Sequence, residues 1–111
     1  MGTLAQDSRI IQRILEEYAS IPYSYGELER ELVFDCERHR YLLMVVGWLD
    51  RRRVHHALIH VDIVGDQIWI QYDGTEEGIA DELVEAGIPK ERIGLGFHPD
   101  RKRPLTGYAV A

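Results

Sequence analysis

The stretch QIWIQYDGTEEGIADELVEA, residues 67–86, decides the fold class of this chain. Its first seven residues place apolar side chains at 68, 70 and 72, which is the period of a strand with one buried face. Residues 54–64 have a similar apolar period, and only Gly65-Asp66 separates the two segments. Because a two-residue loop with glycine first favours a type II′ turn, the two segments are expected to form an antiparallel hairpin.

The turn also predicts a register for this hairpin. The expected core pairs are large and apolar: Ile63 with Ile68, Val61 with Ile70, and Ile59 with Tyr72. The expected pairs of the outer face are Asp62 with Trp69, His60 with Gln71, and Leu58 with Asp73. An exposed tryptophan among polar partners is typical of protein contacts, but the C-terminal segment around Tyr108 could instead cover it. The sequence leaves both possibilities open.

A second helix is expected directly after the 67–73 strand. Thr75 stands where it can cap this helix, and the two glutamates that follow suit its first turn. Apolar residues at 79, 80, 83 and 84 recur at helical spacing. Gly87 is placed to end the helix in a left-handed conformation.

The other segments complete an α+β architecture. Residues 4–19 predict an amphipathic N-terminal helix behind the capping box Thr3–Gln6. Residues 28–36 predict a strand with one buried face, on which Cys36 is a small apolar filler, and residues 40–49 predict a central strand. Residues 93–97 are short and glycine-broken, and 105–110 predict a last strand or an extended arm, so the placement of 98–111 stays open. We expect one domain over residues 1–111, with a mainly antiparallel sheet of four or more strands.

Charge and hydropathy limit the function classes. The formal net charge is −6, and residues 62–91 hold nine acidic residues against one lysine. An acidic chain is a poor non-specific ligand for nucleic acid. No apolar run reaches the roughly 18 residues of a membrane span, and no export signal is recognisable, so a cytoplasmic protein is expected. A single cysteine is consistent with a reducing compartment.

Two short basic clusters keep direct DNA binding as an alternative. They are Arg51, Arg52 and Arg53, and Arg101, Lys102 and Arg103. Such clusters are more often solvated turns than phosphate contacts, and they could also face an acidic partner protein.

No catalytic set, metal site or cofactor is expected. His55, His56, His60 and Asp62 are close in sequence, but His56 and His60 would lie about 13 Å apart along a strand, too far to share one ion. The segment IQYDGT is similar to a phosphatase motif, yet Gln71 stands where that chemistry needs an aspartate nucleophile. A small enzyme that uses His60, Asp62, Asp73 and His98 remains a further alternative.

Several longer segments carry a family resemblance over essentially the whole chain. They are YGELERELVFD (25–35), ERHRYLLMVVGW (37–48), HVDI (60–63), IWIQYDGTEEGIADELVEAGIP (68–89), LGFHP (95–99) and GYAVA (107–111). In these segments the chain resembles the XisI family, the fdxN element excision controlling factor proteins. The resemblance implies a compact, dimeric α+β protein of cyanobacterial type. It also implies association with a XisH protein and with excision of a DNA element by a site-specific recombinase. It provides no catalytic residue.

The expected function is therefore that of a non-enzymatic regulatory or adaptor protein. It would act by protein contact, as a homodimer and with a XisH-like partner, and a recombinase complex is a further possible partner. The candidate interface residues are Leu58, His60, Asp62, Trp69, Gln71, Asp73 and Tyr108.

Overall fold

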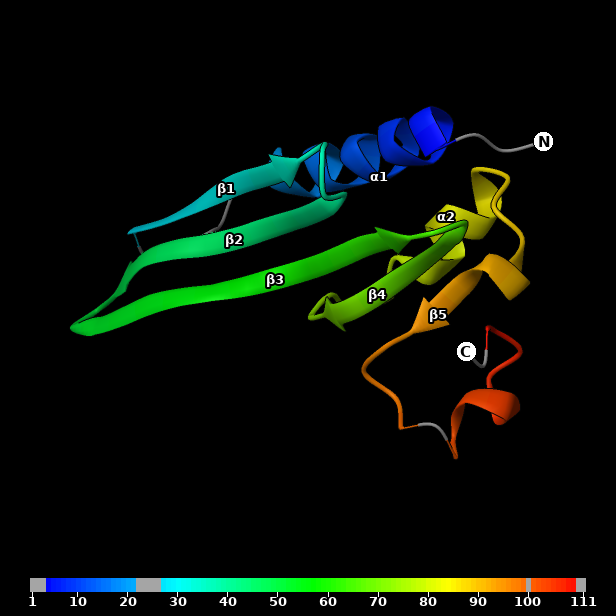
Figure 1. Cartoon of the computed structure of the whole chain (residues 1–111). Helices are drawn as coiled ribbons and strands as arrows, with labels where there is room; N and C mark the ends of the chain where they lie inside the picture. Colours follow the sequence, from blue (N-terminus) through cyan, green and yellow to red (C-terminus); the bar gives the residue numbers. More distant parts are fainter. Residues whose placement is uncertain (1–3, 22–26, 100, 110–111) are drawn as a thin grey trace.

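The computed structural model of the chain describes residues 4–21, 27–99 and 101–109. The elements in chain order are α1 (Leu4–Ala19), β1 (Glu27–Asp35), β2 (Arg40–Leu49), β3 (Arg52–Val64), β4 (Gln67–Asp73), α2 (Ala80–Glu85), the 3-10 turn η1 (Lys90–Arg92), β5 (Ile93–Leu95) and the 3-10 turn η2 (Arg103–Leu105). The five strands form one sheet in the order β1-β2-β3-β4-β5 (Figure 1). Strands β1 to β4 pair antiparallel, whereas β5 is parallel to β4. The predicted α+β fold is confirmed.

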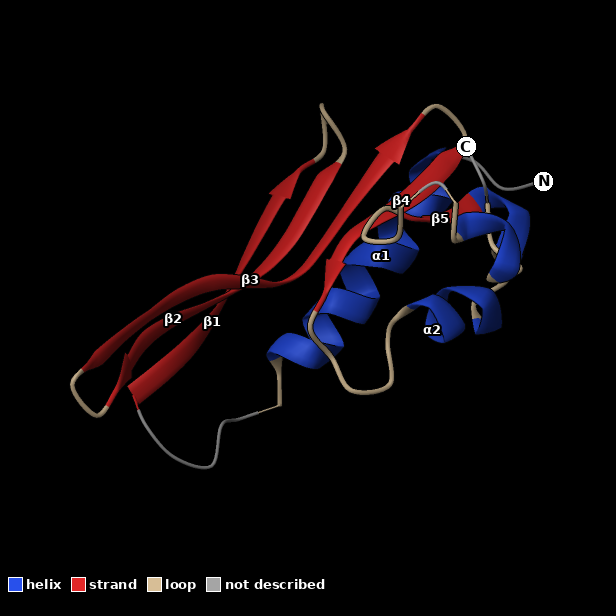
Figure 2. Ribbon diagram, turned by 90° about the horizontal axis from the view of Figure 1, so that it is seen from below, coloured by secondary structure: helices blue, strands red, loops and turns tan. Residues whose placement is uncertain are grey.

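Both helices lie on one face of the sheet (Figure 2). The hydrophobic core fills the space between the helices and this face of the sheet. Helix α1 contributes Ile11, Ile14 and Leu15, each at most 5% exposed, because the apolar period of its sequence puts these side chains on one stripe. Helix α2 contributes Leu83, which is fully buried. The sheet side of the core consists of Tyr41, Leu43, Ile59, Val61, Ile63, Ile68, Ile70, Ile93 and Leu95. We call the opposite side of the sheet the outer face.

The β3–β4 hairpin follows the predicted register only in its first half. Gly65 has a φ of +65°, as the first position of a type II′ turn requires. Ile63 pairs with Ile68, Asp62 with Trp69 and Val61 with Ile70, as predicted. A bulge then leaves Gln71 as an extra residue of β4, so that Tyr72 pairs with His60 and Asp73 with Ile59.

The three predicted pairs beyond this bulge are therefore wrong. Tyr72 turns to the outer face and is 51% exposed instead of buried against Ile59. A second bulge makes Leu58 an extra residue of β3, because Leu43 pairs with Ile59 and Met44 with Ala57. Leu58 and Asp73 thus leave the outer face for the helix side of the sheet.

The segment between β4 and α2 is a loop that Asp73 organises. The Asp73 carboxylate accepts hydrogen bonds from the backbone amide of Ile79 at 2.7 Å and from that of Thr75 at 3.0 Å. The Thr75 hydroxyl also donates to it at 2.6 Å. The predicted cap at Thr75 is wrong, because the helix begins only at Ala80. At the other end Gly87 has a φ of +106°, and the amide of Ile88 donates to the Leu83 carbonyl, so the left-handed end is confirmed.

Strands β1 to β3 continue beyond the helices as a protruding three-stranded arm (Figure 2). We define the arm as residues 27–32, 44–49 and 52–57. No residue of β1 is fully buried, and Leu32 and Val33 are 38% and 49% exposed, so the prediction of one buried face was wrong. Cys36 lies exposed in the turn after β1 rather than on a strand. Thr3 of the expected capping box lies outside the described residues.

The described part of the C-terminal segment passes around the β5 edge of the sheet. The Ala109 amide donates to the Ile93 carbonyl at 2.8 Å, and Gly94 forms a parallel bridge with Ala109. The described residues 101–109 form turns, the 3-10 turn η2 and one bridge at Ala109, so they are neither the last strand nor the extended segment that the sequence left open. Within the described ranges, no helix combines the length and apolar content needed to cross a membrane.

Candidate functional site: the outer face of the sheet

A buried aspartate organises the centre of the outer face. Asp62 is only 7% exposed, and its Oδ1 lies 2.8 Å from Nε2 of His60. The Gln71 side-chain amide donates to Oδ2 at 3.3 Å, and Nε of Arg40 lies 3.6 Å from Oδ1. Side chains from β2, β3 and β4 therefore converge on one carboxylate, which compensates for the cost of burying it. The predicted neighbours His60, Asp62 and Gln71 are brought together.

Trp69 lies beside this cluster and is partly covered by the chain itself. A Cβ atom added at Gly94 would lie 2.3 Å from the indole ring, so the ring rests directly on the β5 backbone. The guanidinium of Arg103 lies over the other side of the indole, 5.2 Å from the ring centroid. Because Trp69 remains partly exposed, the C-terminal segment provides partial cover, and Arg103 rather than Tyr108 provides it.

Three of the seven candidate interface residues lie on the helix side of the sheet. Leu58 packs against the main core, and Asp73 binds the amide that precedes α2. The Tyr108 hydroxyl donates to Asp81 of α2 at 3.3 Å, and Nζ of Lys90 lies 5.5 Å from the Tyr108 ring. The outer face therefore retains His60, Asp62, Trp69 and Gln71 from the predicted set.

The structure adds aromatic side chains that the sequence analysis missed. Tyr72 pairs with His60 on the outer face and is 51% exposed. Phe97 is 47% exposed and follows Gly96, which lies beside the Gln71 side chain. Tyr72 thus borders the Asp62 cluster with exposed aromatic surface, and the exposed Phe97 lies one residue beyond the glycine that contacts Gln71. Tyr72 lies on the outer face only because of the bulge at Gln71, and no pattern in the sequence marks that bulge.

The four residues of the alternative enzyme site do not form one site. His60 and Asp62 meet on the outer face, whereas Asp73 is on the helix side. His98 follows β5, and its ring stacks beside Phe97 at a centroid distance of 4.7 Å. His55 and His56 pair with Val46 and Val45, so they point to opposite faces of the arm. The described residues contain no group of three or more His, Cys, Asp or Glu side chains placed to hold a metal ion.

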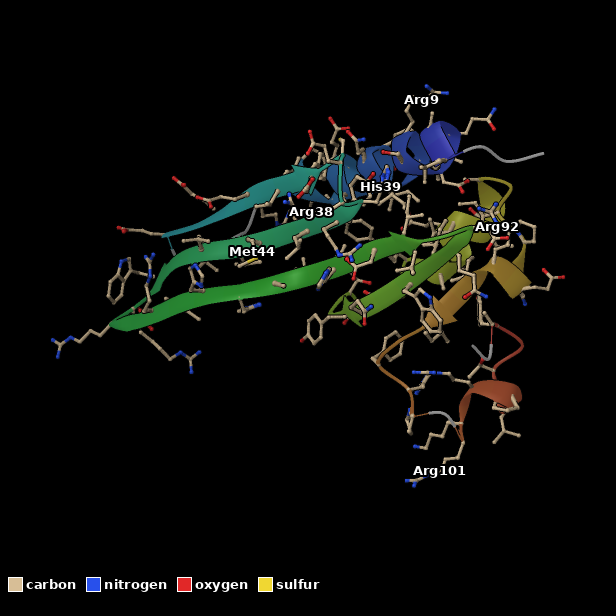
Figure 3. All side chains as sticks on the ribbon, viewed as in Figure 1. Arg9, Arg38, His39, Met44, Arg92 and Arg101 are labelled. Atoms are coloured by element: carbon tan, nitrogen blue, oxygen red, sulfur yellow. The ribbon has the colours of Figure 1, made fainter. Side chains whose placement is uncertain are left out.

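The two basic clusters lie far apart. Arg51–Arg53 lies at the β2–β3 turn, at the tip of the arm, whereas residues 101–103 belong to the C-terminal segment at the other end of the molecule (Figures 1 and 3). One arginine of each cluster stacks on a tryptophan. The guanidinium of Arg53 lies 5.4 Å from the Trp48 ring centroid, and that of Arg103 lies 5.2 Å from the Trp69 ring centroid. The clusters therefore do not combine into one positive patch.

The helix side carries two grooves next to the core. One, of about 920 Å³, is lined by Glu17, Tyr18, Glu76, Glu77 and Glu82 among others. Burial raises the pKa of the Glu82 carboxyl, opposed by its hydrogen bond from Tyr18, and burial together with the charge of Glu82 raises the pKa of Tyr18. The other, of about 900 Å³, lies between α1 and the α2–η1 segment, where Arg92 pairs with the buried Asp7. The first groove is therefore acidic, and the second contains an ion pair within the chain.

Comparisons with known proteins identify the family. The family model described as XisI protein matches residues 1–110. The crystal structure of a XisI-like protein from Anabaena variabilis is similar to the chain with a TM-score of 0.91 and 38% identity, covering 98% of this chain and 100% of the other. The fdxN element excision controlling factor XisI from Anabaena variabilis gives a TM-score of 0.85 and 37% identity, covering 97% of this chain and 98% of the other. A comparison with curated proteins finds no match. The chain belongs to the XisI family.

Proposed function

We propose that this chain is a cytoplasmic, non-enzymatic regulatory protein that controls excision of a DNA element. It acts by protein contact, as a homodimer and with a XisH-like partner. One structural neighbour, at 37% identity over nearly the whole of both chains, is named an excision controlling factor, which supports the regulatory role. The outer face of the sheet supports the mode of action.

The observation that carries this proposal is the aromatic border of the outer face around a rigid polar centre. Tyr72 and Phe97 expose about half of their surface, and Trp69 remains partly exposed beside them. Aromatic side chains are enriched at the energetic centres of protein interfaces because they bury a large area at a small entropic cost. The Asp62 cluster holds the strands beneath them, so the surface is ordered before a partner arrives.

Contact with protein is favoured over direct contact with DNA. The chain carries a net charge of −6, and its two basic clusters lie at opposite ends of the molecule. Binding to DNA draws its affinity from clustered positive charge that neutralises several neighbouring phosphates. A partner protein with DNA-binding surface of its own would connect this chain to excision without such a cluster.

The test is co-purification with a XisH-like protein at micromolar concentration. We expect the wild-type chain to co-elute with the partner. Tyr72→Ala together with Phe97→Ala should weaken the complex by about tenfold or more, as truncation of aromatic hot spots does. The matched control truncates Leu4 and Ile21, which are 46% and 53% exposed and lie at the two ends of the α1 segment, on the opposite side of the sheet. Two wild-type proteins that never associate, or equal effects of the two double variants, would contradict the proposal.

A further inference from the structure

A continuous apolar stripe runs along the outer face of the arm and extends beyond it to Leu42. Every second residue of β2 from Leu42 to Trp48 points to this face, and each of them is at least partly exposed: Leu42, Met44, Val46 and Trp48. Figure 3 shows Met44 on this part of β2. Val33 of β1 and Ala57 of β3 flank the stripe through their pairing with Leu42 and Met44. The core and both helices lie on the other side of the sheet, so among the described elements no helix covers the stripe.

Acidic residues border this stripe on one side, and an arginine and a histidine border it on the other. On β1 the bordering residues are the exposed Glu27, Glu29 and Glu31, which pair with Trp48, Val46 and Met44. On β3 the bordering residues are the exposed Arg53 and His55, which pair with Trp48 and Val46. Glu27 and Arg53 therefore lie at the same level on either side of Trp48. Glu29 and His55 likewise lie on either side of Val46.

We infer that the outer face of the arm binds the same face of a second copy of this chain, about a two-fold axis parallel to β2. This rotation exchanges the β1 side and the β3 side while keeping the level along the strands. Glu27 then lies opposite Arg53 of the second copy, Glu29 lies opposite His55, and the two apolar stripes pack on each other. The interface is isologous, as in most homodimers.

Charge complementarity selects this axis over the alternative. A two-fold axis perpendicular to the strands would lay the β1 side of one copy on the β1 side of the other. The glutamates would then face glutamates, and like charges brought together in an interface are costly. The axis parallel to β2 instead brings Glu27 to Arg53 and Glu29 to His55, and it leaves Glu31 opposite Ala57, so no glutamate faces another glutamate.

The dimensions of the arm set the strength of the contact. Three strands at about 4.8 Å spacing and six residues at about 3.3 Å give a footprint of roughly 14 Å by 20 Å, or about 280 Å² on each copy. The two footprints together cover about 560 Å², well below the roughly 1,200 Å² of a standard specific interface, so the arm contact is weak and the dimer is expected to dissociate on dilution through the micromolar range. A hollow of about 440 Å³ beside Glu27, Val46, Trp48 and Arg53 leaves room for side chains of the second copy.

The inference deepens only the homodimer part of the proposed function, and it is independent of the XisH-like partner. The experiment measures the mass of the purified full-length chain by sedimentation equilibrium across the micromolar range. Glu27→Arg alone and Arg53→Glu alone should each raise the dimer dissociation constant about tenfold, because each places like charges opposite one another. The double variant E27R/R53E should restore the wild-type dissociation constant, because the exchanged charges again lie opposite each other.

A matched control carries the same charge changes away from the arm. Glu91→Arg with Arg101→Glu alters two exposed residues near η1 and in the C-terminal segment and should leave the dimer unchanged. Because all these positions are exposed, each variant is expected to fold, and circular dichroism checks that it does. A chain that stays monomeric, or a dimer that E27R strengthens, overturns the inference. So does a dimer that responds to Tyr72→Ala but not to the arm variants. Co-purification with the XisH-like protein tests the proposed adaptor role separately.

Discussion

His60 Nε2 lies 2.8 Å from Oδ1 of Asp62, and this contact is the centre of the outer face. Asp62 is 7% exposed, and it also receives Gln71 from β4 and lies near Arg40 of β2. One carboxylate therefore ties together three neighbouring strands at the point where the β4 bulge interrupts their ladder. Removing it should affect both the stability of the sheet and the order of the surface above it.

Asp62→Ala should lower the free energy of unfolding by about 1–3 kcal/mol, since it removes the charged carboxylate that forms hydrogen bonds with His60 and Gln71. Urea denaturation followed by circular dichroism measures this loss. Asp66→Ala, at an exposed turn position, is the matched control and should stay within about 0.5 kcal/mol of the wild type. Equal stabilities of the two variants would show that the Asp62 cluster does not hold the strands.

Gly94→Ala should destabilise the chain by about 1–3 kcal/mol, because its Cβ would lie 2.3 Å from the Trp69 ring and the indole must move. Near-ultraviolet circular dichroism should report the displaced indole. In a Trp69→Leu background the same change should cost less, since the smaller side chain leaves room. If Gly94→Ala lowered the free energy of unfolding equally in both backgrounds, the loss would not come from a clash with Trp69, and the account would be contradicted.

Glu82→Gln should stabilise the chain at neutral pH. Burial raises the pKa of Glu82 in the folded state, so the folded state binds this proton more tightly than the unfolded chain does. The stability is therefore fully present below the unfolded-state pKa and falls as the pH rises through the folded-state pKa. The variant should therefore be more stable than the wild type at pH 7 and should gain nothing below about pH 4, the unfolded-state pKa of a glutamate. Glu91→Gln is the exposed control, and a gain that did not depend on pH would contradict this account.

Asp73→Ala should loosen the segment that leads into α2. The carboxylate holds the backbone amides of Thr75 and Ile79, so its loss frees the amide of the residue directly before the helix. We expect a cost of about 1–2 kcal/mol, comparable with the loss of a helix N-cap. Hydrogen exchange at the Ile79 amide should accelerate, while exchange at Val61 in the sheet should be unaffected. Unchanged protection of Ile79 would contradict the role assigned to Asp73.

Sequence patterns predicted the elements that depend only on neighbouring residues. The helical period of residues 4–19 and the glycine-first turn at Gly65 gave a helix and a hairpin that the structure confirms. The register then failed at Gln71, because an alternating pattern continues through a bulge without any mark. With the bulge at Gln71, Asp73 lies on the helix side, where it accepts a hydrogen bond from the amide of Ile79. Contacts between elements, rather than the local sequence, decide the position of the bulge.

Contacts between elements also decided which candidate site residues share one face. His60, Asp62, Trp69 and Gln71 share the outer face because they lie where the register is regular or next to the bulge. Leu58 moved to the other face through the β3 bulge, and Tyr108 followed the C-terminal segment to α2. Alternation in residues 28–36 predicted burial, but the arm extends beyond the helices that would cover it. Burial depends on where the helices end, which the period of a strand does not encode.

The most direct test of the outer face as a contact surface is a calorimetric titration with a purified XisH-like protein. The wild-type chain should bind with a dissociation constant in the micromolar range or below. The Tyr72→Ala/Phe97→Ala chain should bind at least about tenfold more weakly, a difference of about 1.4 kcal/mol. Wild-type affinity in a double variant that remains folded would contradict the central claim that this face recruits the partner.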